Sequence, residues 1–275
     1  MKSLPYELAI PSFRRPETLC KKTLNYLCQT DVNPNRVTLF LSDPSERAQY
    51  ESALATHHPG LSLKIEASVL GIGAARNLIC AHYPPGSCVF SLDDDIEGLY
   101  TRIDRRNVVL CRDLDSLISE SFRLCNWSGI RLWGISPTDN PWFMEPVITT
   151  DLRYIVACAY GFIANDEERL KVTLEDKEDF ERSIRYYLAD GRVMRINWVG
   201  PKTKYYTEPG GMQATRTKLR VKVSAFKLTK MFPELCELNT SKRSGWAEVK
   251  LKDRRDDRKS KSEGARDDLA RLAGG

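Results

Sequence analysis

Short apolar runs alternate with helix-like stretches over the first hundred residues, and this alternation constrains the fold more than any other feature of the sequence. The apolar runs are Tyr6–Ile10, Val37–Leu41, Leu61–Val69 and Cys88–Leu92. The stretches expected to form helices lie between them, at Thr18–Cys28, Ser45–Ala55 and Ala74–His82. Strands that alternate with helices build a largely parallel sheet with helices on its faces, so the sequence predicts an α/β fold.

The pattern is less regular after residue 100. We expect helices over Asp113–Leu124 and Asp176–Leu188, a strand over Tyr154–Ile163, and a turn-rich loop over Trp127–Met144. The segment Arg216–Val223 alternates basic and apolar residues as a strand would, but the glycines before it and the proline after it favour one long helix.

Length and composition indicate one globular domain followed by a tail. The chain has 275 residues, of which 41% are hydrophobic and 29% charged, which excludes a disordered or fibrous protein. From Ser241 the sequence mixes charges and ends in two glycines. We therefore predict a domain over residues 1–240 and a flexible tail over 241–275.

Cysteine usage and the absence of long apolar stretches predict the compartment. The eight cysteines include no C-x-x-C pair, which excludes a zinc ribbon or a thioredoxin motif and predicts buried free thiols in a reducing environment. The first residues lack the apolar core of a signal peptide, and no apolar stretch reaches the roughly 20 residues that span a bilayer. We expect a soluble intracellular protein.

Three consecutive aspartates, Asp93, Asp94 and Asp95, follow the apolar run Cys88–Leu92. Side chains alternate faces along a strand, so Asp93 and Asp95 are expected to point the same way and Asp94 the other. Two carboxylates at the carboxyl end of a sheet strand are suitable ligands for Mg²⁺ or Mn²⁺. The alternative is an acidic turn that caps neighbouring loops, but three adjacent like charges repel and a turn does not require all three.

A glycine-rich turn opens the helix before the aspartates. Its sequence, GIGAARN over Gly71–Asn77, has Arg76 where a dinucleotide-binding fingerprint has its third glycine. Backbone N–H groups at such a turn can bind an anion, with Arg76 beside them. The alternative is an ordinary glycine turn with a surface arginine.

Polar residues also follow the first two predicted strands, where Ser12 and Arg14 follow the first and Asp43 the second. The carboxyl ends of parallel strands lie at one edge of a sheet, so these residues are expected near the aspartates. They are suited to hold a nucleoside and its phosphates, although turns after strands are commonly rich in Ser and Asp.

Glu178 and Asp179 begin the predicted helix Asp176–Leu188. A carboxylate placed there, close to an acceptor hydroxyl and shielded from water, can act as a general base. The alternative is helix capping, because acidic residues stabilise helix N-termini in any protein.

Positive charge is concentrated between residues 195 and 232. This segment holds nine basic residues and one acidic residue, a net +8 in a chain of net +5, so the rest of the chain carries −3. Aromatic residues, among them Trp198 and Tyr205, are interleaved with the basic ones. Basic charge with aromatics is typical of a nucleic-acid binder with stacking surfaces, whereas the alternative is a solvated basic helix face.

Taken together in chain order, these motifs resemble those of nucleotide-sugar glycosyltransferases of the GT-A fold, over roughly residues 5–235. The segments IPSFRRPETL, GIGAARNLI, SLDDDI, NPWFM, EDFERSIRYYLADG and YYTEPGG are, more narrowly, similar to the glycosyltransferases associated with TET/JBP oxygenases, which include the base J glucosyltransferase and phage and viral relatives. The resemblance implies a soluble enzyme of an infected cell or a nucleus, which transfers a sugar from a donor such as UDP-glucose to hydroxymethylated pyrimidines in DNA.

The resemblance also implies roles for single residues. Asp95 would be the direct ligand of Mn²⁺ or Mg²⁺, with Asp93 on the ribose or in the metal shell. Asp179 would be the base of an inverting transfer, Asp43 a nucleobase contact and Arg76 a diphosphate contact. Many GT-A enzymes use a later histidine as a further metal ligand, but this chain has no histidine after His82.

The remaining site predictions divide the domain into two halves. Residues 1–100 are expected to bind the nucleotide-sugar, with Ser12, Arg14, Asn77 and Asp94 as further donor contacts. Residues 101–240 are expected to bind the acceptor DNA, through Lys202, Lys204, Arg216, Arg220, Trp198 and Tyr205.

Other functions remain open at this point. A glycosyltransferase with a protein or saccharide acceptor would have the same donor site. A non-catalytic nucleic-acid-binding module would need only the basic segment, and a nucleotidyltransferase would also use paired aspartates and a metal.

Overall fold

The computed structural model describes residues 4–203, 217–239 and 246–252. In these residues the main sheet has eight strands, in the spatial order β3 (Lys64–Ala67), β2 (Val37–Leu41), β1 (Glu7–Ser12), β4 (Cys88–Leu92), β9 (Ala159–Ile163), β7 (Leu132–Ile135), β10 (Val193–Ile196) and β8 (Ile148–Asp151). The pairings make β8 and β9 run opposite to the other six strands. The predicted α/β fold with a largely parallel sheet is confirmed.

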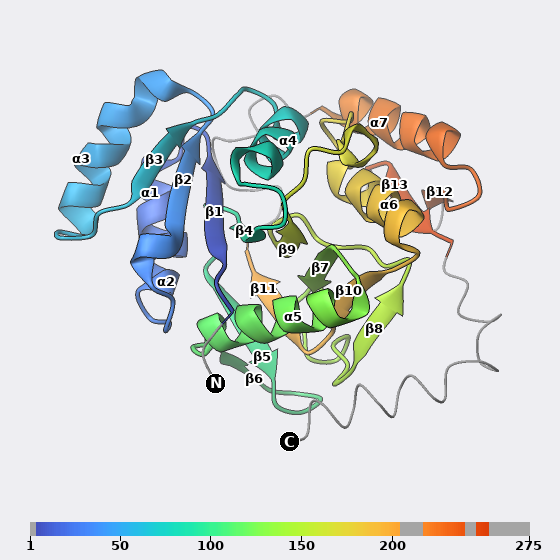
Figure 1. Cartoon of the computed structure of the whole chain (residues 1–275), viewed down its shortest axis with the longest axis horizontal. Coiled ribbons are helices and arrows are strands. Elements are labelled where there is room, and N and C mark those ends of the chain that lie inside the picture. The colour runs from blue at the N-terminus through green and yellow to red at the C-terminus, as the bar shows by residue number, and fades with distance from the viewer. Residues whose placement is uncertain (1–3, 204–216, 240–245, 253–275) are drawn as a thin grey trace.

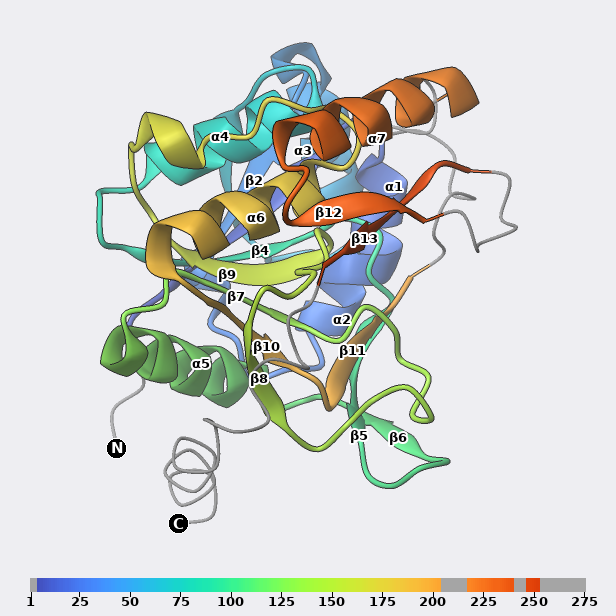
Figure 2. The same cartoon turned by 90° about the vertical axis from the view of Figure 1, so that its right-hand side faces the viewer.

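Helices cover both faces of this sheet because its strands are apolar on both sides. In β1, Leu8 and Ile10 belong to one hydrophobic core and Ala9 to the other. The first core is completed by α1 (Pro16–Leu19), the π-helical turn Cys20–Leu24, α2 (Asn25–Leu27), α3 (Arg47–His57) and α5 (Leu114–Ser128). The second is completed by α4 (Ile72–His82) and α6 (Glu178–Asp190), which lie above the sheet in Figure 2 with α5 below.

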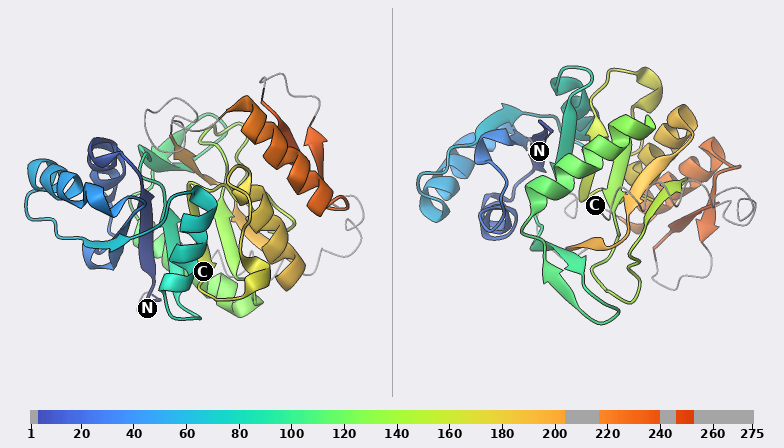
Figure 3. Two further views of the ribbon diagram at one scale, coloured as in Figure 1. Left: turned by 90° about the horizontal axis from the view of Figure 1, so that it is seen from above. Right: turned by 60° about the horizontal axis from the view of Figure 1, so that its bottom comes forward.

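Smaller elements are added at two places. A three-stranded sheet of β11 (Val199–Lys202), β5 (Gly98–Arg102) and β6 (Val108–Leu110) begins directly after the aspartates (Figure 1). A third core joins α6 to α7 (Lys218–Met231) and to the antiparallel pair β12 (Cys236–Asn239) and β13 (Glu248–Leu251). Short 3₁₀ turns cover Pro34–Arg36, Pro44–Glu46 and Glu168–Leu170. Figure 3 shows α3 and α7 at opposite ends of the molecule.

The predicted helices after residue 100 are present as α5 and α6, and the strand predicted over Tyr154–Ile163 is present only over Ala159–Ile163, as β9. Two other predictions about this part of the chain are wrong. The predicted loop 127–144 contains β7, an interior strand whose Trp133 is fully buried and stacks on Phe90. All four residues of β7 are buried, which removes the alternation that marks a strand. Within the predicted tail, Glu248–Leu251 forms β13. The helix favoured for the basic segment is present as α7.

The cysteines are free thiols, as the sequence predicts. None of the eight forms a disulfide in the structure, and six of them are buried. Among the described helices, none combines the length and the apolar character needed to cross a lipid bilayer.

Candidate active site

The three aspartates, which we call the acidic turn (Asp93, Asp94 and Asp95), lie where the sequence places them, at the edge of the sheet where β1, β2 and β4 end. The hydroxyl of Ser12, the last residue of β1, donates a hydrogen bond to Asp94 Oδ2 at 2.5 Å. The main-chain N–H of Asp93 donates to the Cys158 carbonyl at 2.9 Å. The ends of two parallel strands and the start of β9 therefore hold the turn.

Two arginines bind the acidic turn. Arg15 Nη1 lies 3.2 Å from Asp94 Oδ1 and 3.1 Å from Asp95 Oδ2, while Arg76 Nη2 lies 2.5 Å from Asp93 Oδ1. The expected alternation of faces does not continue through the turn, because β4 ends at Leu92 and Asp94 and Asp95 share Arg15. Arg15 was not among the predicted site residues. Its only signal in the sequence is the basic pair after the first strand.

Negative charge remains in excess at the acidic turn, where three carboxylates meet two guanidinium groups. Burial raises the pKa of Asp94 to about 7, although Arg15 opposes this shift. Burial and the nearby charge of Asp93 raise the pKa of Asp95. Carboxylates that repel one another in a low-dielectric site favour a bound cation.

The donor set of the acidic turn suits a divalent cation that retains other ligands. Asp93 and Asp95 are hard oxygen ligands, whereas Asp94 is 5% exposed and held by Ser12 and Arg15. Within the described ranges, no group of three or more Asp, Glu, His or Cys side chains is arranged to bind a metal. Mg²⁺ and similar ions are commonly bound through one or two carboxylates, with water and substrate phosphates completing the shell.

The glycine-rich turn contacts a carboxylate of the same chain, that of Glu175. Gly71 has a φ of +97°, and a Cβ there would lie 2.7 Å from Glu175 Oε1. The Gly73 N–H points to Glu175 Oε2 at 3.4 Å, so a carboxylate already lies at the N-terminus of α4. A Cβ on Gly73 would lie 2.6 Å from the Leu174 carbonyl oxygen. Both glycines thus allow the segment before α6 to pack closely against α4.

Arg76 and Asn77 are both fixed by protein contacts. Besides Asp93, the Arg76 guanidinium donates to Ser91 Oγ at 2.8 Å, and its side chain is 3% exposed. Burial opposes the charge of this arginine, but Asp93 holds its pKa above the usual value. Asn77 exchanges two hydrogen bonds, of 2.8 and 3.0 Å, with the backbone of Val172. The structure therefore places Arg76 at the acidic turn and Asn77 in a loop contact.

Asp179 lies in the first turn of α6 and is half-buried. Its Oδ2 accepts a hydrogen bond of 2.5 Å from the Tyr154 hydroxyl, and the Tyr154 ring stacks on Phe180 at 4.3 Å. Arg76 experiences the charges of both Asp93 and Glu178, the residue before Asp179. The start of α6 is therefore electrostatically coupled to the arginine that holds the acidic turn.

The other predicted donor contacts lie further out. Arg14 has a side chain that is 62% exposed and forms an ion pair with Glu46 at 3.4 Å. The Asp43 carboxylate accepts hydrogen bonds from the Ser45 N–H at 3.0 Å and the Ser45 hydroxyl at 2.6 Å, so it caps the following 3₁₀ turn.

The predicted acceptor residues that the structure describes have different surroundings. Trp198 is half-buried against the first core, and Arg220 Nε lies 2.6 Å from the buried Asp176 carboxylate. Lys202 lies over the Tyr100 ring at 5.7 Å, and its carbonyl accepts from the Glu97 N–H close to the acidic turn. Lys204, Tyr205 and Arg216 lie outside the described residues.

An exposed aromatic pair was missed by the site prediction. Trp142 and Phe143 are each 70% exposed, in the loop between β7 and β8. Because β7 and β4 both run antiparallel to β9, this loop leaves the sheet at the same edge as the acidic turn. The NPWFM segment was the available signal, but isolated tryptophans are more often core or loop anchors.

One face of α7 combines apolar and basic side chains in solvent. We call it the exposed face of α7, and it consists of Leu219, Lys222, Val223, Phe226, Lys227 and Lys230. Phe226 is 51% exposed, with Lys230 Nζ 4.6 Å from its ring centre. The helix carries no acidic residue, so this part of the predicted basic segment is uncompensated along its own length.

Comparison with solved structures shows what the fold resembles. TarS residues 1–349 from S. aureus, in complex with UDP-GlcNAc, matches with a TM-score of 0.52 at 13% identity, over 82% of this chain and 67% of that chain. The mannosyltransferase PcManGT from Pyrobaculum calidifontis, in complex with GDP-Man and Mn²⁺, matches with a TM-score of 0.51 at 14% identity, over 83% and 63% of the two chains.

These matches concern the fold. The chain covers 44% of a longer TarS structure, so it spans less than half of that chain. No protein-family model and no curated protein matches the sequence. The fold is similar to that of GT-A-like glycosyltransferases, as the order of the sequence motifs predicted.

Proposed function

We propose that the protein is a metal-dependent glycosyltransferase that transfers a sugar from a nucleotide-sugar to a hydroxymethylated pyrimidine in DNA, with inversion at the anomeric carbon. One observation carries the proposal: in a GT-A-like fold, the acidic turn and the start of α6 meet at Arg76, which binds Asp93 and experiences the charge of Glu178. Residues 1–100 would bind the donor and residues 101–240 the acceptor.

The donor side of the proposal rests on the acidic turn. TarS has been seen with UDP-GlcNAc and PcManGT with GDP-Man and Mn²⁺, which supports a nucleotide-sugar donor for a chain of similar fold. Asp93 and Asp95 would hold Mn²⁺ or Mg²⁺, which when bound neutralises charge on a departing diphosphate. Arg15 orients Asp95, and Ser12 with Arg15 keeps Asp94 in place. The exposed Arg14 and the half-buried Asp43 flank this edge and remain our candidates for outer donor contacts.

Asp179 is the proposed general base. In an inverting transfer the acceptor oxygen forms a bond to the anomeric carbon while the bond from that carbon to the diphosphate oxygen breaks. Asp179 takes the proton that the acceptor hydroxyl loses, a contribution of about 10²–10⁴-fold. The Tyr154 hydroxyl donates to Oδ2 of this carboxylate, which fixes its orientation and leaves Oδ1 toward its own helix turn.

The DNA acceptor is supported by charge and by exposed aromatic rings. The exposed face of α7 and Lys202 supply positive charge that can contact phosphates. Trp142 and Phe143 are exposed in a loop at the same edge of the sheet as the acidic turn, and they are suited to stack against a base displaced from the duplex. Such stacking contributes about 1–3 kcal/mol of binding free energy per base. Trp198 and Arg220, which are committed to the core and to Asp176, contribute less in this view.

The test is a screen of nucleotide-sugars with Mn²⁺ against two matched DNA duplexes, one with hydroxymethylcytosine or hydroxymethyluracil and one unmodified. We expect a mass increase of one sugar only on the hydroxymethylated strand, with inverted anomeric configuration. Donor hydrolysis without transfer to either DNA would support the assignment of the donor site and reject DNA as the acceptor. DNA binding without any donor turnover would identify a non-catalytic binding module. Release of the sugar 1-phosphate with a nucleotide joined to the acceptor would identify a nucleotidyltransferase.

A further inference from the structure

Arg182, in the middle of α6, is a buried arginine without a hydrogen-bonding partner in the part of the chain that the structure describes. Its residue is 4% exposed, and all three guanidinium nitrogens lack a hydrogen-bond acceptor among the described residues. Its guanidinium carbon lies 3.7 Å from the centre of the Tyr160 ring. On the same helix, Arg185 pairs with Glu181. A cation–π contact does not replace the hydrogen bonds that a buried guanidinium requires.

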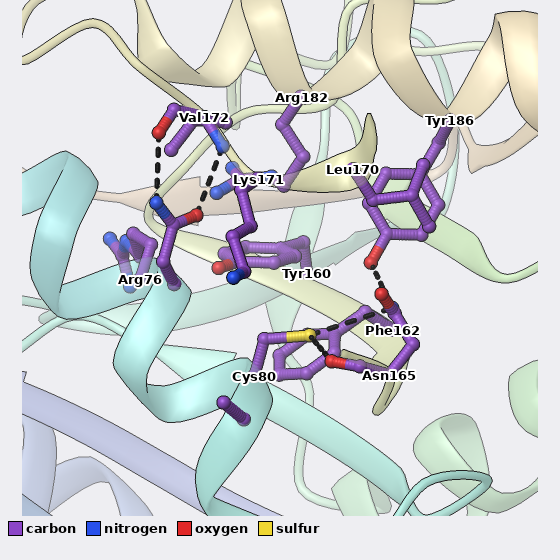
Figure 4. A pocket seen from close by; sticks show the side chains of 12 residues that line it. Arg76, Cys80, Tyr160, Phe162, Asn165, Leu170, Lys171, Val172, Arg182 and Tyr186 are labelled. Atoms are coloured by element: carbon purple, nitrogen blue, oxygen red, sulfur yellow. Dashed lines mark hydrogen bonds between the residues drawn. The ribbon is translucent and has the colours of Figure 1, made fainter. Parts of the chain in front are cut away.

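Arg182 lines a small pocket between α4 and α6, drawn in Figure 4. The pocket contains the side chains of Arg76 and Lys171 as well, and none of the described residues that line it is acidic. Its polar amides are already engaged, because Asn77 binds the Val172 backbone and Asn165 donates to the Tyr186 hydroxyl at 2.9 Å. The lining nitrogens that lack a hydrogen-bond partner among the described residues belong to two cations, all three of Arg182 and the Nε of Arg76.

The size of the pocket limits what can bind. Its volume of about 30 Å³ corresponds to roughly two water molecules. Water would satisfy the N–H groups of Arg182 but would leave its charge uncompensated. The planar guanidinium fork is complementary to two oxygens held in one plane. Apolar side chains such as Leu170 and Phe162 form other parts of the wall.

We propose that this pocket is a binding site for a small oxyanion, a carboxylate or phosphate group that places two oxygens in this space, with Arg182 as its principal ligand. The site is distinct from the acidic turn, although Arg76 contributes to both. Bound oxyanion would stabilise the packing of α4 against α6. A small free oxyanion and the carboxylate or phosphate end of a larger metabolite share this chemistry.

The test is thermal unfolding at constant ionic strength with acetate, inorganic phosphate or chloride as the varied anion. We expect the Tm of the wild type to rise saturably by several degrees with acetate or phosphate, and less with chloride, which cannot occupy both arms of the fork. Arg182→Met should lose this rise. Arg169→Met, which removes a surface arginine with a 65% exposed side chain, should retain it.

Three results would overturn the proposal: no saturable rise in the wild type, an equal rise in Arg182→Met, or equal effects of chloride and the oxyanions. Arg182→Lys keeps the charge without the fork and tests the proposal if the methionine variant does not fold. It should weaken the apparent affinity for acetate or phosphate by at least about tenfold, and an unchanged affinity would also overturn the assignment.

Discussion

The acidic turn and the exposed face of α7 differ in whether their charged side chains are paired and in how far they are exposed to solvent. At the turn, Asp94 is buried, Asp93 and Asp95 are half-buried, and each carboxylate is bound by Arg15 or Arg76. On α7, three lysines stand in solvent beside Val223 and Phe226, which are 44% and 51% exposed, and no acidic side chain of that helix accompanies them. Charged groups held in ion pairs and largely shielded from water are preorganised for chemistry at fixed positions, whereas unpaired, exposed charges can contact a partner of variable position.

Because of this difference, we expect large mutational effects at the acidic turn and small ones on the exposed face of α7. Electrostatic interactions are strong in a water-excluded site and weak where solvent and salt screen them. Changes at the acidic turn and at Asp179 should therefore act on chemistry or folding by large factors. Changes on α7 should act on binding by small, salt-dependent increments.

The largest expected effect is that of Asp179→Asn. Loss of the proposed base should reduce transfer by about 10²–10⁴-fold while the affinity for the nucleotide-sugar changes little, because in the proposed mechanism the carboxylate acts on the acceptor hydroxyl. Steady-state transfer and donor binding by calorimetry measure the two quantities. Tyr154→Phe, which removes only the hydrogen bond to Asp179, serves as the control and should reduce transfer much less. A near-wild-type rate for Asp179→Asn would direct attention to Glu178.

Arg15→Met should produce the largest loss of stability. Arg15 and both of its aspartate partners have side chains less than one-fifth exposed, and removing one partner of a buried ion pair typically costs about 3–5 kcal/mol. Urea denaturation should show this decrease in the free energy of unfolding. The matched control, Arg47→Met, breaks a pair whose side chains are 55% and 53% exposed and should cost at most about 1 kcal/mol. Equal losses would show that the acidic turn is more solvated than its burial indicates.

Replacement of the aromatic pair at the sheet edge should have an intermediate effect. Trp142→Ala with Phe143→Ala should raise the KM for hydroxymethylated DNA by about tenfold or more, since stacking contributes ~1–3 kcal/mol per base. Donor hydrolysis without DNA should persist. Trp127→Ala, at a 66% exposed tryptophan of α5, is the control and should leave the KM unchanged. Similar effects at both places would remove the argument for a base platform.

The smallest effect is expected on the exposed face of α7. Lys222→Gln with Lys230→Gln should weaken DNA binding only a few-fold at moderate salt. The log–log salt slope should fall by about 0.7–0.9 for each phosphate that the variant no longer neutralises. Lys21→Gln with Lys64→Gln, two lysines near the opposite end of the sheet, should leave the slope as it is. An unchanged slope in the α7 variant would place the DNA-binding surface elsewhere.

The N-terminal half of the fold was predictable because its signals are local. The runs Val37–Leu41 and Cys88–Leu92 become β2 and β4 with the predicted bounds, since each is a continuous apolar segment ended by polar residues. β7 was not predictable, because four buried residues containing a glycine carry no periodicity. Its place in the sheet depends on pairing with β9 and β10, which are distant in sequence.

The candidate site was predictable in its residue types more than in its contacts. Topology alone brings Ser12 to Asp94, since both follow parallel neighbours. The link between Arg15 and the aspartates spans about 80 residues and depends on side-chain reach, which sequence spacing does not encode. The carboxylate of Glu175 at the glycine turn is another such contact. We predicted an external anion there, and the structure shows one from the chain itself.

The central claim is that the acidic turn supports metal-dependent transfer from a nucleotide-sugar, and Asp95 tests it most directly. The measurement is donor turnover with Mn²⁺ for the wild type, Asp95→Asn and Asp94→Asn, normalised to the folded fraction. The account predicts that Asp95→Asn loses at least about 100-fold in turnover per folded molecule, together with some stability because it also removes an ion pair with Arg15. Asp94→Asn, which alters a side chain buried against Ser12 and Arg15, should lose mainly stability. Equal and mild losses of turnover in both variants, or full turnover after chelation of the metal, would contradict it.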